Sequence, residues 1–156
     1  MPKAIGTYLQ TVLTDLGYVA EVKPISTNLQ FTYIQNTNNK VQMSITQWYQ
    51  DYPAASDFLN ILFGCASFTP GSDSSINIAG FCDKDIQAKM DAALLQGVTD
   101  PEGANKVWAE VDKAVTDAAP MAALFTPKHV DVTAKRVGNF QFNSEFYWMV
   151  SQSWVQ

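Results

Sequence analysis

Residues 47–63 read Gln-Trp-Tyr-Gln-Asp-Tyr-Pro-Ala-Ala-Ser-Asp-Phe-Leu-Asn-Ile-Leu-Phe. Up to this stretch, apolar and polar residues alternate, which predicts a half-buried strand over Lys40–Trp48. After Pro53 the apolar residues are spaced as in a helix, which we predict from about Ser56 to Phe63. The stretch therefore predicts a strand-to-helix junction that carries two aromatic rings beside an acid.

Helical and extended patterns alternate along the rest of the chain as well. Further helices are predicted over Ile5–Leu16, around Leu29–Ile34, over Asp83–Gln96 and from Asp100-Pro101 to just before Pro120. Further strands are predicted over Tyr18–Lys23, Met121–Phe125 and Val130–Thr133. Met90 and Trp108 fall at helical core spacing, so we assign them to the core. The predicted fold class is α/β, with a mixed sheet flanked by helices.

Composition limits the classes of partner. The hydrophobic share is 47% and the charged share is 16%, which is typical of a globular chain and not of a disordered one. The formal charge of −5, with a pI near 4.6, argues against nucleic acid or an anionic membrane surface as a partner.

The junction carries the residue types of a small-molecule site. Gln47, Trp48, Tyr49 and Asp51 stand together there. Aromatic faces bury apolar area, and a carboxylate holds a cation or an ammonium group. A purely structural alternative stays open, in which Trp48 is a core residue and Asp51 caps the following helix.

Arrangements that enzymes commonly use are not visible. The single histidine, His129, has no serine in a Gly-x-Ser-x-Gly elbow to act with, and no Gly-rich phosphate loop follows a predicted strand. Two cysteines and one histidine without close spacing do not form a tetrahedral metal site. We expect no catalytic residues, no metal and no cofactor.

The junction resembles a signature of the family-5 extracellular solute-binding proteins, the oligopeptide- and dipeptide-binding components of ABC importers. The resemblance is carried by Trp48-x-x-Asp51-Tyr52-Pro53, followed by an acid and Phe-Leu. Weaker similarities follow in the same order along the chain, at Ala4–Tyr18, Asn77–Ile86, Trp108–Pro120 and Arg136–Phe140. The proteins of this family are about three times longer and form two lobes, and the similarity is to their C-terminal part. It implies the C-terminal lobe portion of a periplasmic-binding-protein-like fold, a fragment with half of the cleft.

The resemblance also implies a function. Two lobes would close on a peptide or another small solute, and the closed form would dock on the membrane permease of the importer. An aspartate at the position of Asp51 would pair with the peptide's terminal ammonium group, and Trp48 would wall a side-chain pocket. This chain has Gln47 where the family commonly has glycine, which permits a different solute. The alternative function is an exported structural or protein-interaction α/β module without a small-molecule ligand.

Cys65 and Cys82 lie in a Gly-, Ser- and Pro-rich stretch between two predicted helices. A disulfide between them would close a loop of about 17 residues, worth about 3 kcal/mol in the chain-entropy model. The residues alone leave open two unrelated buried thiols. Relatives of the resembled family often carry a cysteine pair flanking this loop, so the resemblance implies the disulfide and an oxidising, extracytoplasmic setting.

The domain organisation that we expect has two parts. Residues 1–134 would form the α/β lobe portion, and residues 135–156 an aromatic tail that returns toward the missing N-terminal lobe. The aromatic residues of the tail are Phe140, Phe142, Phe146, Tyr147, Trp148 and Trp154. The chain's start does not resemble an export signal. For a parent protein at the cell surface or in the periplasm, we expect a lipoprotein signal upstream.

Overall fold

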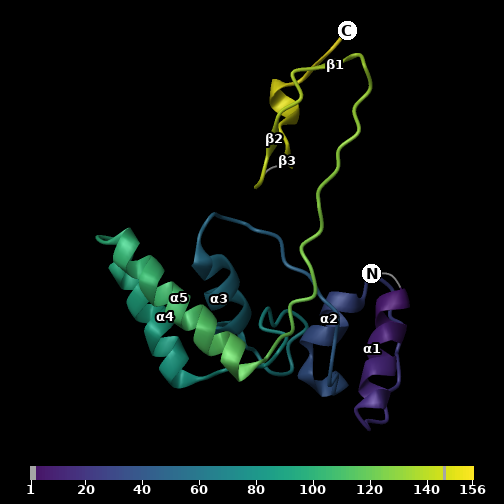
Figure 1. Cartoon of the computed structure of the whole chain (residues 1–156), viewed down its shortest axis with the longest axis vertical. Coiled ribbons are helices and arrows are strands. Elements are labelled where there is room, and N and C mark those ends of the chain that lie inside the picture. The colour runs from purple at the N-terminus through teal and green to yellow at the C-terminus, as the bar shows by residue number, and fades with distance from the viewer. Residues whose placement is uncertain (1–2, 146) are drawn as a thin grey trace.

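The computed structural model describes residues 3–145 and 147–156, and helices dominate it (Figure 1). The helices are α1 (Lys3–Asp15), α2 (Gln30–Gln35), α3 (Ala55–Phe63), α4 (Lys84–Gln96) and α5 (Pro101–Ala118). Short 3-10 turns lie at Thr37–Asn39, Cys65–Ser67 and Val150–Gln152. The strands are β1 (Val137–Gly138), β2 (Phe142–Asn143), β3 (Tyr147–Trp148) and β4 (Trp154–Val155).

The core lies between α3, α4 and α5. The most extensive contact joins α4 to α5, and α3 packs against both of these helices. Met90 on α4 and Val111 on α5 are completely buried, and Trp108 is 7% exposed, so the predicted core positions of Met90 and Trp108 are confirmed. Apolar residues at helical spacing thus build one three-helix body.

Two aspartates define where the helices of this body begin. The carboxylate of Asp83 accepts hydrogen bonds from the backbone N–H groups of Asp85 and Ile86, which begins α4. The carboxylate of Asp100 accepts from the N–H of Gly103, and Pro101 occupies the first turn of α5. Both aspartates satisfy N–H groups that have no partner inside the helix. The predicted boundaries of these two helices are confirmed.

The predicted mixed sheet flanked by helices is wrong. The described residues are 44% helix and 5% strand, and their strands form only two-stranded antiparallel pairs. Val137 pairs with Val155 in β1–β4, and Phe142 pairs with Trp148 in β2–β3. The segments predicted as strands, at Tyr18–Lys23, Lys40–Trp48, Met121–Phe125 and Val130–Thr133, are not strands in the structure. Alternating side chains predict an extended backbone but do not supply the second strand that a ladder requires.

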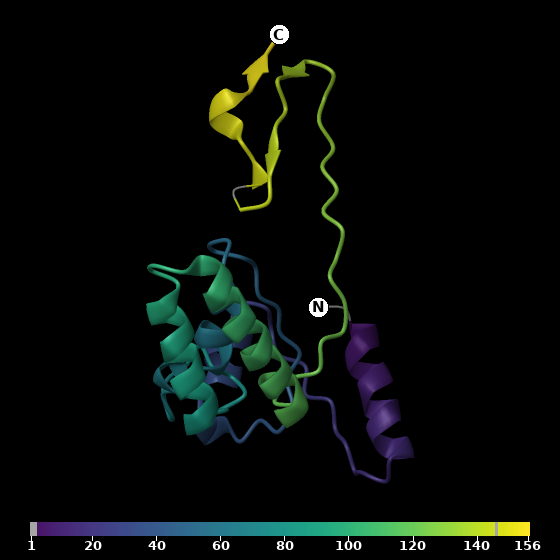
Figure 2. The same cartoon turned by 60° about the vertical axis from the view of Figure 1, so that its left-hand side comes forward.

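Two parts of the chain extend away from the three-helix body (Figures 1 and 2). Helix α1 stands apart from α3, α4 and α5 in both views, and none of its described side chains is buried (Figures 1 and 2). Residues 120–136 run as a long connection from the end of α5 to the terminal strands (Figure 2). Along this connection Val130 and Val132 are 79% and 93% exposed, which leaves them outside any core.

Within the described part of the chain, no helix combines the length and the apolar character needed to cross a bilayer.

Candidate functional site

The predicted ligand residues lie in an extended segment that leads into α3. Gln47 and Tyr49 are exposed, Trp48 is half-buried, and the chain bends at Asp51. The side chain of Asp51 is exposed, while Ala54 occupies the N-cap of α3 and makes no side-chain cap bond. The structural alternative of Asp51 as the helix cap is therefore wrong. An exposed carboxylate at a bend is free to meet a ligand.

Asp57 fixes this bend from inside the protein. Its side chain is completely buried in the first turn of α3, and its Oδ2 accepts a hydrogen bond from the backbone N–H of Asp51 at 3.0 Å. A carboxylate in the first turn is favoured by the partial positive charge of the helix N-terminus. Asp57 thus reaches back past the N-cap Ala54 to the entering chain, farther than the acid of a capping box, which bonds the N–H of the N-cap residue.

Two buried polar atoms beside the bend lack partners within the described residues. They are Asp57 Oδ1 and the indole Nε1 of Trp48. Buried polar atoms in proteins are nearly always hydrogen-bonded, to protein groups or to ordered water. Trp48 in the segment thus has a donor, and Asp57 in α3 has an acceptor, that no described residue bonds.

The terminal strands come back to this segment. The rings of Tyr49 and Tyr147 meet edge to face, with their centroids 6.2 Å apart. Next to them, the side-chain amide of Gln50 donates to Glu145 Oε1 at 3.5 Å. The β2–β3 hairpin therefore lies against the predicted ligand segment, a contact that the sequence analysis did not predict. Phe146, named among the aromatic residues of the tail, falls outside the described residues.

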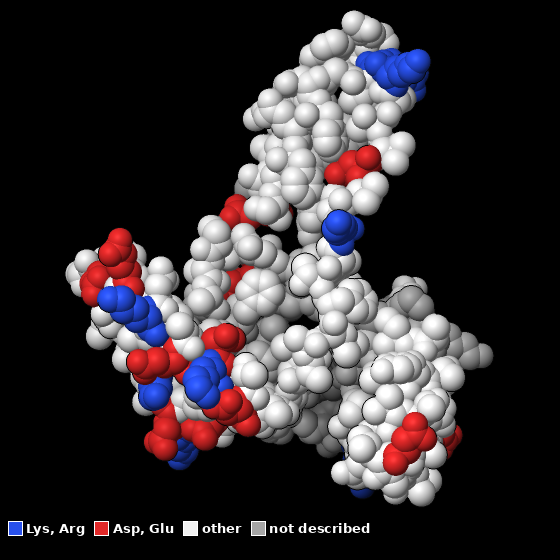
Figure 3. Space-filling model, viewed as in Figure 1, with Lys and Arg blue, Asp and Glu red and all other residues white. Residues whose placement is uncertain are grey.

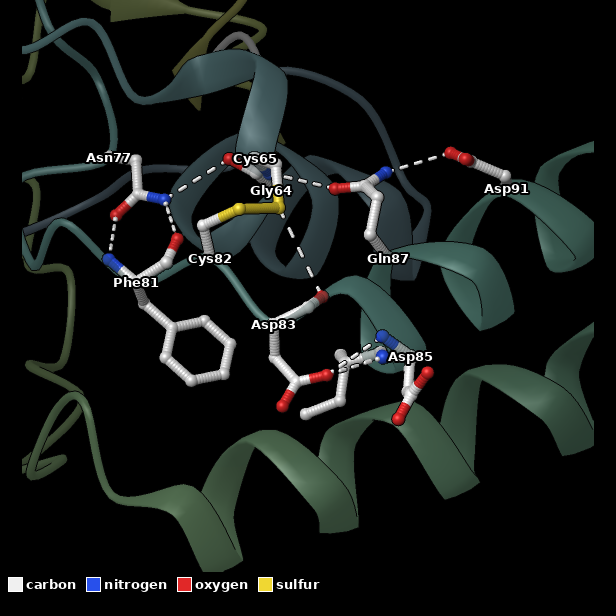
Figure 4. Close-up of a disulfide and its surroundings, with 10 residues drawn as sticks. Gly64, Cys65, Asn77, Phe81, Cys82, Asp83, Asp85, Gln87 and Asp91 are labelled. Atoms are coloured by element: carbon white, nitrogen blue, oxygen red, sulfur yellow. Dashed lines mark hydrogen bonds between the residues drawn. A yellow bond between two sulfur atoms is a disulfide. The ribbon is translucent and has the colours of Figure 1, made fainter.

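A disulfide closes the loop between α3 and α4 (Figure 4). The sulfur atoms of Cys65 and Cys82 are bonded across a separation of 17 residues, which confirms the predicted pairing. The buried side chain of Asn77 holds the same loop, because it donates to the carbonyl oxygens of Gly64 at 3.1 Å and Phe81 at 2.7 Å. A disulfide is consistent with an oxidising, extracytoplasmic location.

A groove lies elsewhere on the molecule. A groove of about 510 Å³ opens between α3 and α5, and residues such as Phe58, Trp108 and Met121 line it. Gln47, Trp48, Tyr49 and Asp51 do not contribute to its lining. The residues of the candidate site thus lie outside this groove, on an extended segment in which Gln47, Tyr49 and Asp51 are exposed.

The arrangement suits binding by charge and aromatic contact. Asp51 offers an exposed carboxylate, and Tyr49 an exposed ring two residues away. Sequence reasoning did not include Asp57 among the site residues. Its signal was present, since an acid at this point is part of the Asp-Tyr-Pro signature and also stands in the first turn of the predicted helix.

Comparisons of this chain with protein-family models, with curated proteins and with solved structures find no match.

Proposed function

We propose that this chain belongs to the solute-binding component of an ABC importer and that it binds peptides outside the cell. Support comes from the Trp48-x-x-Asp51-Tyr52-Pro53 signature together with the position of Asp51. The carboxylate is exposed at a bend whose backbone is fixed by a buried acid. The hydrogen bond from Asp51 to Asp57 is the observation that carries the proposal, because it holds the backbone of Asp51 in place before a ligand arrives. We call the Asp51 carboxylate, as a partner of a peptide's terminal ammonium group, the ammonium clamp.

In this mechanism Asp51 accepts hydrogen bonds from the terminal ammonium group of a peptide. A charge-assisted bond of this kind is about twice as strong as a neutral one, and a closing cleft strengthens it further by excluding water. Trp48 provides an apolar wall beside the ammonium group. Its unpaired indole N–H has the chemistry to donate to a peptide carbonyl oxygen.

The disulfide agrees with the location that this function requires. Cys65 and Cys82 are bonded, as is usual for proteins outside the cytoplasm. The permease partner and the lobe that completes the cleft belong to the proposal as well. The proposal includes no nucleic-acid partner, because the chain carries a net charge of −5.

Titration calorimetry with trialanine tests the proposal, using the full-length parent protein. Asp51→Ala is expected to weaken binding at least about tenfold, the loss expected for a charge-assisted hydrogen bond. Asp15→Ala is the matched control, because Asp15 is an exposed aspartate at the end of α1. Equal affinities of the wild type and Asp51→Ala would reject the ammonium clamp. Mass spectrometry of compounds that co-purify with the protein would then identify the solute class.

A specific observation favours one second candidate, a protein-interaction module. Residues 120–136 are extended and mostly exposed, and they form no strand before Val137. Exposed extended backbone with apolar side chains is able to pair with a strand of another protein. Under this alternative, trialanine would not bind, and Val132→Asp would abolish capture of the partner without unfolding the helices.

A further inference from the structure

Four aromatic rings from three separate segments meet beside the bend. We call Tyr49, His129, Phe142 and Tyr147 the aromatic cluster. The imidazole of His129 stacks on Phe142 at 5.3 Å between centroids and lies 5.0 Å from Tyr147. Tyr147 also touches Tyr49, at 6.2 Å, and Phe142, at 6.3 Å. The cluster thus joins the segment before α3, the long connection after α5 and the terminal hairpin.

The aromatic cluster is open to solvent. Tyr49 is 53% exposed and Phe142 is 50% exposed, whereas large rings in a globular protein are usually well covered. The rings contact one another closely, so a ligand would lie on their outer faces and not between them. An aromatic face carries a partial negative charge that attracts cations.

The charges around the cluster have mostly one sign. Glu145 stands beside Tyr147 and contacts Gln50, Asp131 lies 2.9 Å from the imidazole of His129, and Asp51 follows Tyr49 by two residues. Lys128, next to His129, is the basic side chain nearest in sequence to these groups. On the face seen in Figure 3, charged side chains of both signs gather over α4 and α5. The carboxylates of Glu145 and Asp131 therefore place negative charge beside the exposed rings, which complements a cation.

The position of the cluster relative to Asp51 limits which part of a ligand reaches it. Two residues of extended chain span at most about 7 Å, so Tyr49 lies within one or two peptide residues of Asp51. A peptide whose terminal ammonium group is held by Asp51 would therefore bring its first or second side chain to the aromatic cluster.

We propose that the aromatic cluster is a specificity site, which takes a lysine or arginine side chain at the first or second position of the bound peptide. The proposal rests on the proposed peptide-binding function for its ligand. The cationic head lies on the faces of Tyr49 and Phe142, and Glu145 neutralises it at the rim. The apolar stem of such a side chain packs on the ring edges.

The test compares matched tripeptides by titration calorimetry on the same full-length parent protein. Lys-Ala-Ala and Ala-Lys-Ala are measured against Nle-Ala-Ala and Ala-Nle-Ala, in which norleucine has a similar length without the charge. We expect one of the lysine peptides to bind about fivefold more tightly than its norleucine counterpart, which corresponds to a single cation–π contact. Tyr49→Leu keeps apolar bulk but removes the ring, and it is expected to bring this ratio close to one. Glu145→Gln is expected to lower the ratio without abolishing it.

Tyr18→Leu is the matched control, since Tyr18 is a tyrosine 65% exposed just after α1. It should leave the ratio unchanged. Equal binding of lysine and norleucine peptides by the wild type would overturn the specificity site. So would a ratio that survives in Tyr49→Leu.

A second probe separates this proposal from the proposed function. N-acetyl-lysine amide has the cationic side chain but no terminal ammonium group, and NMR of the aromatic protons reports its contact. If it shifts the resonances of Tyr49 and Phe142 while no tripeptide binds, the ammonium clamp is rejected, and the binding of cations by the aromatic cluster is supported. If trialanine binds through Asp51 while the lysine peptides bind no more tightly than the norleucine peptides, the ammonium clamp is supported and the specificity site is rejected. If neither probe binds, both proposals are rejected.

Discussion

The backbone N–H of Asp51 donates to the buried carboxylate of Asp57 at 3.0 Å. One acid is exposed and the other is completely buried, and six residues separate them. The bond ties the bend at the end of the extended segment to the first turn of α3. The position of the Asp51 backbone is therefore fixed by helix α3.

Asp57→Ala is expected to lower the free energy of unfolding by about 2 kcal/mol, because the N–H of Asp51 loses its acceptor in a part-buried hydrogen bond. Asp57→Asn keeps a side-chain oxygen of the same size and should cost less than Ala. Urea unfolding followed by circular dichroism measures both. If Asn proves as damaging as Ala, the hydrogen bond to Asp51 does not carry the effect.

The helices could be predicted from the sequence because their signals are local. Asp83 and Asp100 begin α4 and α5 through bonds to N–H groups two or three residues away, and apolar spacing marked the buried faces. Helix α3 was predicted from Ser56 and begins at Ala55. Local hydrogen bonds need nothing from distant parts of the chain.

The prediction of a sheet was wrong because a strand needs a second strand to form its hydrogen bonds. Val130 and Val132 alternate as in a strand, yet in the structure they are exposed and unpaired. The same limit applied to the site. Asp51 and Tyr49 were named from the sequence, but the contact of Tyr49 with Tyr147, almost a hundred residues later, could not be. The burial of Asp57 likewise depends on packing that no local pattern encodes.

Replacement of both Cys65 and Cys82 by serine is expected to lower the free energy of unfolding by about 3 kcal/mol, since the closed loop spans 17 residues. The loop between α3 and α4 contains no helix or strand beyond one short 3-10 turn, so the covalent link restricts the unfolded chain considerably. Thermal unfolding with and without a reductant is the matched measurement. The wild type in reductant should behave like the double variant, and a reductant-insensitive wild type would contradict the prediction.

The stability of α5 should depend on pH through Asp100. The N–H of Gly103 first, and the side-chain amide of Gln96 second, lower the pKa of Asp100 from its ordinary value of 3.8. A carboxyl group with a lowered pKa in the folded state stabilises the fold above its unfolded pKa. This contribution disappears as the pH falls through the folded pKa.

Asp100→Asn keeps a capping side chain and removes the charge. The melting temperature of the wild type should exceed that of Asp100→Asn by a constant amount near neutral pH. The gap should close below about pH 4, where the carboxyl group takes up a proton. Melting curves at several pH values decide this. A gap that stays constant down to about pH 2 would show that the charge of Asp100 is not involved.

We expect the buried side chain of Asn77 to stabilise the loop between α3 and α4 about as much as the disulfide does. Its buried amide donates to the carbonyl oxygens of Gly64 and Phe81, and its Oδ1 accepts from the N–H of Phe81 at 3.2 Å. Asn77→Ala leaves the carbonyl oxygen and the N–H of Phe81 without these partners and removes one of two donors to the Gly64 carbonyl oxygen, which is expected to cost about 2–3 kcal/mol. Asn77→Asp is the sharper comparison, because it keeps the acceptor for Phe81 but replaces the donor by a second acceptor that faces two carbonyl oxygens. We expect Asp to be at least as destabilising as Ala in urea unfolding at neutral pH. If Asp behaves like the wild type, the two donated bonds do not hold the loop.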